Sequence, residues 1–304
     1  MALRIYYENY KGPIEIAESI EQAIHSSLSE CLKCYAIATY TALLPTRNAI
    51  VKEMSNEPLN KVCWMYHDIM DLYGDKGNMM VLQKRCEDRQ IDFHLETCAI
   101  GEKKDLSSFD LVFLGGGADK EQISLIPDLL KRKENIQKAM DENTFILLIC
   151  GGYQLFGQYY IAADGSRIEG LKFYNYYTDT GKQGTRCIGN IIIDAKLDEL
   201  HTKIIGFENH GGQTLHVTHP LGKVLHGFGN AFDAGYEGFY DGKILGTYLH
   251  GPLLPKNPDV ADFVITKAIQ KKHPDFTIND LKPLDNTFEK NARKALLKRF
   301  QIQE

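Results

Sequence analysis

The chain is organised around one stretch, Thr144-Phe145-Ile146-Leu147-Leu148-Ile149-Cys150-Gly151-Gly152-Tyr153-Gln154. Its apolar, partly β-branched run predicts a buried strand that ends at Cys150, and residues 153–156 predict the start of a helix. A strand that turns sharply into a helix at a nucleophilic side chain is a nucleophile elbow. Such a turn would hold Cys150 strained and exposed, near a helix N-terminus that favours the thiolate. The alternative is an inert cysteine buried at a strand end.

Strands and helices alternate on the N-terminal side of this stretch. Strands are predicted at residues 62–66, 91–97 and 111–114, a loop at 72–78, and helices at 79–89 and 121–140. This alternation predicts an α/β fold with a doubly wound, mostly parallel sheet. Ligands bind beyond the carboxyl ends of the strands in such sheets. Both Gly115-Gly116-Gly117 and Cys150 follow predicted strands, which favours a functional site there.

The C-terminal half is richer in strands. These are predicted at residues 188–193, 204–208, 223–225, 238–240 and 243–248, with a hairpin turn at Asp241-Gly242. The last strand leads into Gly246-Thr247-Tyr248-Leu249-His250-Gly251-Pro252, and helices are predicted at residues 259–272 and 286–300. His216 and His219 resemble a metal pair, but a solvated loop is the favoured interpretation and no metal site is predicted.

The first 57 residues form a separate predicted unit. A helix at residues 13–27, a strand at 34–40 and a helix at 42–54 precede a linker at 55–58. The unit is too small to bury a substantial core alone. Cys31 and Cys34 are spaced as a C-x-x-C pair, but no second pair completes a zinc site and the pair precedes a strand, so chance or packing is favoured.

Composition excludes several classes of function. The chain has 304 residues, of which 43% are hydrophobic and 25% charged, with a net charge of −5, so a basic nucleic-acid-binding surface is not expected. No apolar run is long enough for a membrane span, and the N-terminus lacks the pattern of a signal peptide. Seven scattered cysteines favour a reduced, cytoplasmic protein. No P-loop sequence occurs, so activation of a substrate by ATP is not expected of this chain alone.

A cysteine nucleophile needs a base and donors for an oxyanion. His250 is the candidate base, because it also ends an apolar strand, although a turn histidine is the alternative. The candidate oxyanion donors are the backbone N–H groups of Gly151 and of the glycine loop, with Gly116 at its centre.

Four motifs resemble class I glutamine amidotransferases of the cobyric acid synthase type, over residues 61 to the C-terminus. They are Ile-Cys-Gly-Gly-Tyr-Gln, Gly-Gly-Gly-Ala-Asp, Phe-Glu-Asn-His-Gly-Gly and Gly-Thr-Tyr-Leu-His-Gly-Pro, with Leu-Tyr-Gly-Asp-Lys-Gly-Asn at residues 72–78 as a further hallmark. The resemblance implies a flavodoxin-like fold, Cys150 as the nucleophile that attacks the glutamine side-chain amide, and His250 as the proton shuttle. It also implies a substrate-binding set: Arg186 on the α-carboxylate, with Gln154, Asn209, His210 and Gly211 lining the pocket.

The same motifs are most similar to glutaminase subunits that form heterodimers with a MurT-like ligase. That resemblance implies no cofactor in this chain, with ATP and Mg²⁺ on the ligase, which would amidate D-glutamate of the lipid II stem peptide to D-isoglutamine. Residues 35–47 resemble the end of the MurT C-terminal domain, so residues 1–57 are interpreted as a remnant of the partner and 58–304 as the amidotransferase domain. Pro252 stands where many class I enzymes carry an acid, and Leu148 where many have glycine. The orienting carboxylate is therefore expected from a partner or absent.

Three alternatives remain open from sequence. The first is a cobyric-acid-type amidotransferase acting on a corrinoid, although the long synthetase domain and nucleotide site are missing. The second is a Cys–His peptidase or other hydrolase on the same fold. The third is a scaffold or sensor with an inert cysteine.

Overall fold

The structure is a computed structural model that describes residues 19, 22, 61–180 and 185–303. Contacts group Asn60–Arg89 and Phe93–Glu304 into one compact unit. The predicted unit over residues 1–57, including its helices, its strand and the Cys31–Cys34 pair, lies outside the described residues apart from Ser19 and Gln22.

A six-stranded sheet forms the centre of this unit, in the order β13-β14-β4-β3-β1-β2. Its strands are β1 (Lys61–Met65), β2 (His94–Cys98), β3 (Leu111–Leu114), β4 (Phe145–Ile149), β13 (Phe239–Tyr240) and β14 (Ile244–Thr247). Five of them run parallel, and β13 pairs antiparallel with β14 at one edge. The predicted mostly parallel sheet is therefore confirmed.

The strand β4 lies inside the sheet, between β3 and β14. All five of its residues are buried. A strand covered on both faces cannot alternate polar and apolar residues, which explains the continuous apolar run before Cys150. Because β14 is the direct parallel neighbour of β4, the residues that follow these two strands emerge at the same edge of the sheet.

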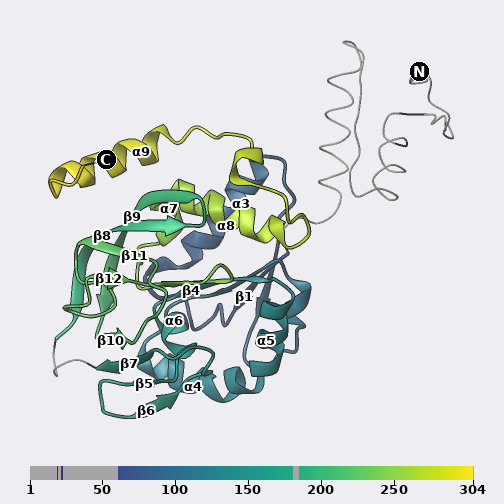
Figure 1. Cartoon of the computed structure of the whole chain (residues 1–304). Helices are drawn as coiled ribbons and strands as arrows, with labels where there is room; N and C mark the ends of the chain where they lie inside the picture. The colour runs from purple at the N-terminus through teal and green to yellow at the C-terminus, as the bar shows by residue number, and fades with distance from the viewer. Residues whose placement is uncertain (1–18, 20–21, 23–60, 181–184, 304) are drawn as a thin grey trace. The chain divides into compact units, whose positions relative to one another are not determined.

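Helices cover both faces of the sheet, with α3, α7 and α8 above and α4, α5 and α6 below in the view of Figure 1. The helices are α3 (Lys76–Glu87), α4 (Asp119–Lys131), α5 (Lys133–Asp141), α6 (Gly151–Leu155), α7 (Leu253–Lys256), α8 (Pro258–Gln270) and α9 (Thr287–Arg299), with 3₁₀ turns η1 (Leu72–Gly74), η2 (Leu106–Ser108) and η3 (Ile278–Asp280). Within the described residues, no helix has the length and apolar character needed to cross a bilayer.

The clearest differences from the predicted elements lie at residues 121–140 and 72–78. The helix predicted over residues 121–140 is divided at Arg132, whose φ of −90° and ψ of 0° end α4 before α5 begins. Arg132 is anchored there by hydrogen bonds to Asp128 and to the carbonyl of Ala99. The loop predicted at residues 72–78 is wrong in part, because η1 occupies its start and α3 already begins at Lys76.

Two further four-stranded sheets make up the strand-rich half. The first, in the order β10-β7-β5-β6, contains β5 (Tyr159–Ile161), β6 (Arg167–Glu169), β7 (Tyr177–Thr180) and β10 (Gly212–Leu215). None of its four strands was predicted from sequence. The second, in the order β12-β11-β8-β9, contains β8 (Cys187–Leu197), β9 (Leu200–His210), β11 (Gly222–His226) and β12 (Tyr236–Glu237). The predicted hairpin at Asp241-Gly242 is confirmed, since it joins β13 to β14.

A buried ion cluster joins α3 to α8. Asp262 receives two hydrogen bonds from Arg85 and one from Arg89, each 2.8 Å long. Both arginine side chains are almost completely buried. Removing one partner of such a cluster leaves a buried charge without compensation, so the cluster fixes α3 against α8.

Candidate functional site

Cys150 occupies the predicted elbow between β4 and α6. Its φ of 49° and ψ of −103° lie outside the regions that L-residues favour, which is the strain expected of such a turn. The N–H of Cys150 donates to the carbonyl of Thr247 on β14, and its carbonyl accepts from Gln154 in the first turn of α6. The predicted exposure is wrong, because only 6% of the residue is accessible.

Close backbone approach explains the glycines around this elbow. A side chain at Gly152 would lie 2.6 Å from the carbonyl oxygen of Leu114, so the elbow packs directly on the end of β3. A side chain at Gly151 would lie 3.2 Å from the backbone nitrogen of Gly117. The glycine loop after β3 therefore lies against the elbow, as predicted for a shared site.

His250 lies beside Cys150. A β-carbon on Gly116 would be 2.9 Å from Cε1 of His250 and 3.4 Å from Cβ of Cys150. The backbone of His250 is held by two hydrogen bonds to Phe207 on β9, and Gly251 turns the chain with a φ of +93°. The structure thus brings together the predicted nucleophile, the predicted base and the predicted oxyanion loop.

A carboxylate that was not predicted faces the same histidine. Asp75, at the start of α3, is completely buried, and its Oδ1 lies 3.7 Å from Nδ1 of His250. Its Oδ2 accepts a hydrogen bond of 2.6 Å from the N–H of Gly116. The signal available in the sequence was the Leu-Tyr-Gly-Asp-Lys-Gly-Asn motif, which carries Asp75.

Opposing effects act on the pKa of His250. Burial alone would lower its pKa, but the neighbouring Cys150 thiolate and the Asp75 carboxylate raise the pKa above its ordinary value. A histidine whose proton is held in this way can act as a proton donor beside the Cys150 sulfur.

Arg186 lies at an exposed position together with Asn209 and Gly211. Its Nε and Nη2 donate to Oδ1 of Asn209 at 3.1 and 3.0 Å, and Nη2 also donates to the Asn209 carbonyl. Asn209 in turn donates to the hydroxyl of Tyr73, whose ring meets that of His250 edge-on at 5.1 Å. Three of the five predicted substrate-binding residues are thus gathered on the His250 side, joined by Tyr73, which was not predicted.

Gln154 and His210 lie deeper, around the buried ring of Tyr248. The Gln154 amide accepts from Gln122 and donates to the Tyr248 hydroxyl. The His210 ring stacks on Tyr248 at 3.7 Å and bonds through Nδ1 to the carbonyl of Gly212. Protein groups thus engage both ends of the Gln154 amide, whereas Nε2 of His210 has no hydrogen-bond partner among the described residues and lies 3.8 Å from Oε2 of Glu208.

The oxyanion loop also differs in detail from the expectation. The N–H of Gly116 donates to Asp75 and so is not directed at a reacting oxygen. The backbone nitrogen of Gly117, the next residue of the loop, would lie 3.2 Å from a β-carbon on Gly151. The role of oxyanion donor predicted for Gly151 is compatible with its place at the elbow. Gly116 could take this role only if its N–H group released Asp75.

A second buried carboxyl, Glu237, lies behind β14. Its oxygens accept from the backbone N–H of Tyr248 at 2.6 Å and from the hydroxyl of Thr247 at 3.0 Å. Complete burial raises the pKa of Glu237 to about 8, although these two hydrogen bonds act in the opposite direction. Through these two hydrogen bonds, Glu237 fixes the segment that leads from the end of β14 to His250.

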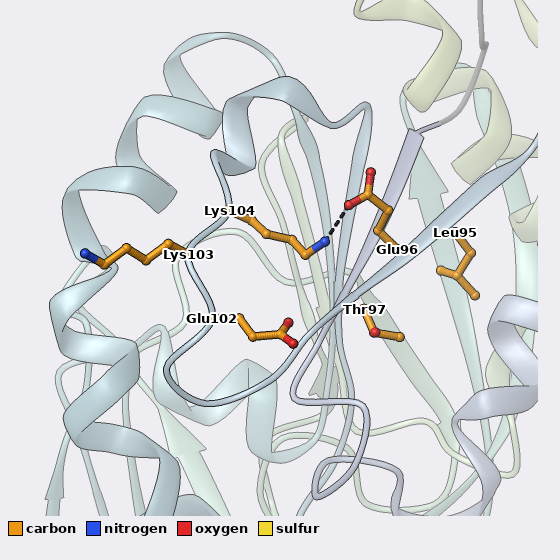
Figure 2. A pocket seen from close by; sticks show the side chains of 6 residues that line it. All are labelled: Leu95, Glu96, Thr97, Glu102, Lys103 and Lys104. Carbon is orange, nitrogen blue, oxygen red and sulfur yellow. Dashed lines mark hydrogen bonds and ion pairs between the residues drawn. The ribbon is translucent and has the colours of Figure 1, made fainter.

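An open cavity of about 550 Å³ lies elsewhere, along the edge strand β2. It is lined by Leu95, Glu96, Thr97, Glu102, Lys103 and Lys104, with Lys104 paired to Glu96 (Figure 2). β2 is three strands from β4, about 14 Å at the usual strand spacing. This cavity is therefore separate from the site at Cys150. Among the described residues, no cluster of His, Cys, Asp or Glu could hold a metal ion.

Comparison with known proteins agrees with this geometry. Residues 61–258 match the family described as the CobB/CobQ-like glutamine amidotransferase domain. The chain is 37% identical to the lipid II isoglutaminyl synthase (glutamine-hydrolyzing) subunit GatD of Staphylococcus aureus over 79% of this chain and 97% of that protein. It is 36% identical to the subunit of the same name from Streptococcus pneumoniae over 70% of this chain and 81% of that protein.

A more distant relative is a probable cobyric acid synthase of Methanocaldococcus jannaschii. It is 30% identical over 48% of this chain and 31% of its own length. The sheet with its cysteine elbow, the adjacent histidine and the matched span of residues 61–258 together place this chain in the CobB/CobQ-like glutamine amidotransferase family.

Proposed function

We propose that this chain is the glutamine-hydrolysing subunit of a lipid II isoglutaminyl synthase. The observation that carries the proposal is the convergence at Gly116, where a β-carbon would lie 2.9 Å from the His250 ring and 3.4 Å from Cβ of Cys150. Two relatives named as glutamine-hydrolysing subunits of that synthase, matched over 97% and 81% of their length, support the same assignment.

The chemistry follows from the geometry. The Cys150 thiolate attacks the side-chain carbonyl carbon of glutamine, and backbone N–H groups at Gly151 and Gly117 stabilise the oxyanion. The His250 imidazolium gives its proton to the departing nitrogen, which leaves as ammonia and a γ-glutamyl thioester remains. Neutral His250 then removes a proton from water, which attacks the thioester, and glutamate and the thiolate are released.

Arg186 is proposed to bind the α-carboxylate of glutamine. A guanidinium can hold a carboxylate through two parallel hydrogen bonds. Arg186 already has two of its nitrogens on Asn209, so its planar group is fixed in orientation before glutamine arrives. Asn209 and Gly211 would line the same side of the pocket.

The ammonia acceptor is proposed to be lipid II, bound to a MurT-like ligase that forms a heterodimer with this chain. That ligase would carry ATP and Mg²⁺, and this chain would contribute no cofactor. The complex would act in the cytoplasm, amidating D-glutamate of the stem peptide. The corrinoid alternative is less well supported, because the cobyric acid synthase relative matches 48% of this chain and 31% of its own length.

The test is glutamine-dependent amidation. The full chain is co-purified with a MurT-like ligase and incubated with ATP, Mg²⁺, glutamine labelled with ¹⁵N in the side-chain amide, and a lipid II acceptor. The proposal expects the label in the acceptor, and loss of label transfer from glutamine but not from added ammonium salt in Cys150→Ala. Transfer from glutamine by Cys150→Ala would contradict it, as would peptide cleavage without glutamine.

A further inference from the structure

We propose that Gln122 of α4 is a positioning residue, which holds the glycine loop against the elbow so that the N–H groups of Gly117 and Gly151 can meet the oxyanion of the reaction. The inference rests on the proposed function, because that oxyanion forms only when the thiol attacks the amide carbonyl of glutamine. It gives a role to a buried amide outside the Cys150–His250 pair.

The two proposed oxyanion donors have no acceptor in the protein. Gly117 and Gly151 are both buried, and within the part of the chain that the structure describes neither N–H donates a hydrogen bond. The next residue of the elbow differs, because the N–H of Gly152 donates to the carbonyl of Gly115 at 3.2 Å. Buried backbone N–H groups are normally paired. Two unpaired N–H groups on adjoining segments are therefore available to an oxygen that develops negative charge.

Hydrogen bonds fix the rest of the glycine loop. The N–H of Gly116 donates to Asp75 at 2.6 Å, and the carbonyl of Gly116 accepts from the N–H of Leu72 at 3.1 Å. The carbonyl of Gly117 accepts from Nε2 of Gln122 at 3.1 Å. This bond fixes the peptide plane that follows Gly117, a residue whose rotation no side chain limits. Gln122 therefore restrains the loop at the residue whose own N–H is unpaired.

The same amide reaches the elbow. Nε2 of Gln122 also donates at 3.1 Å to Oε1 of Gln154 on α6. A β-carbon on Gly151 would lie 2.9 Å from Nε2 and 3.1 Å from Cδ of Gln122, so the amide packs directly on the backbone of Gly151. Only 2% of Gln122 is exposed. A single buried amide thus joins Gly117 to α6, and it fixes the two segments that carry the unpaired N–H groups.

Packing alone does not explain an amide at this position. Oε1 of Gln122 is buried and has no hydrogen-bond partner among the described residues. A buried amide oxygen without a partner carries a desolvation cost, which an apolar side chain of similar length would avoid. The feature that only the amide supplies is a donor that bonds two acceptors at once, one on the glycine loop and one on α6.

The experiment compares Gln122→Met with wild type, and Gln137→Met is the matched control. Methionine has a similar volume but no donor, so both bonds from Nε2 are lost. Gln137 is an exposed glutamine of α5 that donates to Asp141. For each protein, kcat and KM for glutamine are measured in the complex with the ligase, and alkylation of Cys150 by iodoacetamide is followed by mass spectrometry. Alkylation displaces iodide from a saturated carbon and forms no oxyanion, so it reports on the thiol alone.

Gln122→Met should lower kcat about 10- to 100-fold, since outright removal of one oxyanion donor costs about 100- to 1,000-fold and here the donors are displaced. KM and the alkylation rate should stay within about threefold of wild type, because the ground state and the thiol are unaffected. Gln137→Met should stay within about twofold in all three measurements. A wild-type kcat in Gln122→Met would overturn the inference. An alkylation rate that falls as much as kcat would also overturn it, because the residue would then act on the thiol or on the fold as a whole.

A second variant, Gln122→Glu, decides the matter if Gln122→Met does not fold. A protonated carboxyl can still donate one hydrogen bond, whereas the ionised form only accepts and would face two acceptors, the Gly117 carbonyl and Oε1 of Gln154. The ratio of its kcat to that of wild type should therefore fall about tenfold or more between about pH 6 and pH 9, since burial raises the pKa of a carboxyl into this range. A ratio that does not change with pH would overturn the inference. Absence of glutamine hydrolysis by the wild-type complex would instead contradict the proposed function, and the inference with it.

Discussion

Replacing Gly116 by alanine tests the convergence of the site. The backbone of Gly116 does not have a left-handed φ, so alanine adds no conformational strain there. The added methyl would lie 2.9 Å from Cε1 of His250, 3.3 Å from Oδ2 of Asp75 and 3.4 Å from Cβ of Cys150. Carbon atoms prefer separations of about 3.5–4.0 Å, so the histidine or the loop must move by roughly 0.6–1 Å.

A displacement of about 1 Å at a catalytic group costs on the order of 100-fold in rate, or about 2.7 kcal/mol in the barrier. Overpacking should also lower the free energy of unfolding by about 1–3 kcal/mol. The assay measures kcat and KM for glutamine in the complex with the ligase, and the unfolding midpoint of the full chain in urea.

Gly165→Ala is the matched control for this prediction. Gly165 has a φ of +81° and open space around it, so alanine there costs about 1 kcal/mol of backbone strain away from the site. We expect it to lower stability without changing glutamine hydrolysis. Wild-type hydrolysis by Gly116→Ala would contradict the convergence of His250, Asp75 and Cys150 at this point, because the methyl group could not then fit without moving them.

Three further predictions concern binding, pH and stability. Asn209→Ala should raise KM for glutamine about tenfold with kcat within about threefold, because Arg186 loses the acceptor that orients it, and an unchanged KM would remove Asn209 from substrate binding. Glu237→Gln should gain stability relative to wild type as pH rises from 4.5 to about 8, since the folded chain keeps this carboxyl protonated while the unfolded chain ionises; equal differences in urea denaturation at about pH 5 and pH 9 would contradict this. Asp262→Asn should lower the free energy of unfolding by about 3–5 kcal/mol because it leaves buried arginines unpaired. In contrast, the exposed Asp88→Asn should change it by less than about 1 kcal/mol, and similar losses in the two variants would refute a buried ion cluster.

The elements that sequence predicted well are those whose pattern is local and long enough to be distinctive. The apolar run that becomes β4 and the glycines after Cys150 mark a buried strand and a tight turn without any knowledge of distant residues. The hairpin at Asp241-Gly242 is also a local signal. By contrast, β5, β6, β7 and β10 have three or four residues each and mixed burial, so their pairing with one another decides their conformation.

Among the site residues, too, some could be placed from local sequence and fold class, and others depend on long-range packing. Cys150 and His250 follow the two adjacent parallel strands β4 and β14, so their proximity could be expected from the fold class. Asp75 could not be located in this way, because it precedes a helix and reaches His250 only through the packing of α3 on the turn at Pro252. The burial of Cys150 was also not predicted, since the glycine loop that packs against it comes from a distant part of the sequence.

The role of Cys150 as the nucleophile can be tested by covalent labelling with diazo-oxo-norleucine, an electrophilic mimic of glutamine. The full chain, with and without its ligase partner, is incubated with the reagent, and each cysteine peptide is examined by mass spectrometry. We expect one adduct on Cys150, which forms much more slowly in His250→Gln, and no adduct on Cys187, because burial raises the pKa of that thiol to about 11. Labelling of Cys187 instead of Cys150, or labelling of Cys150 at an unchanged rate in His250→Gln, would contradict it.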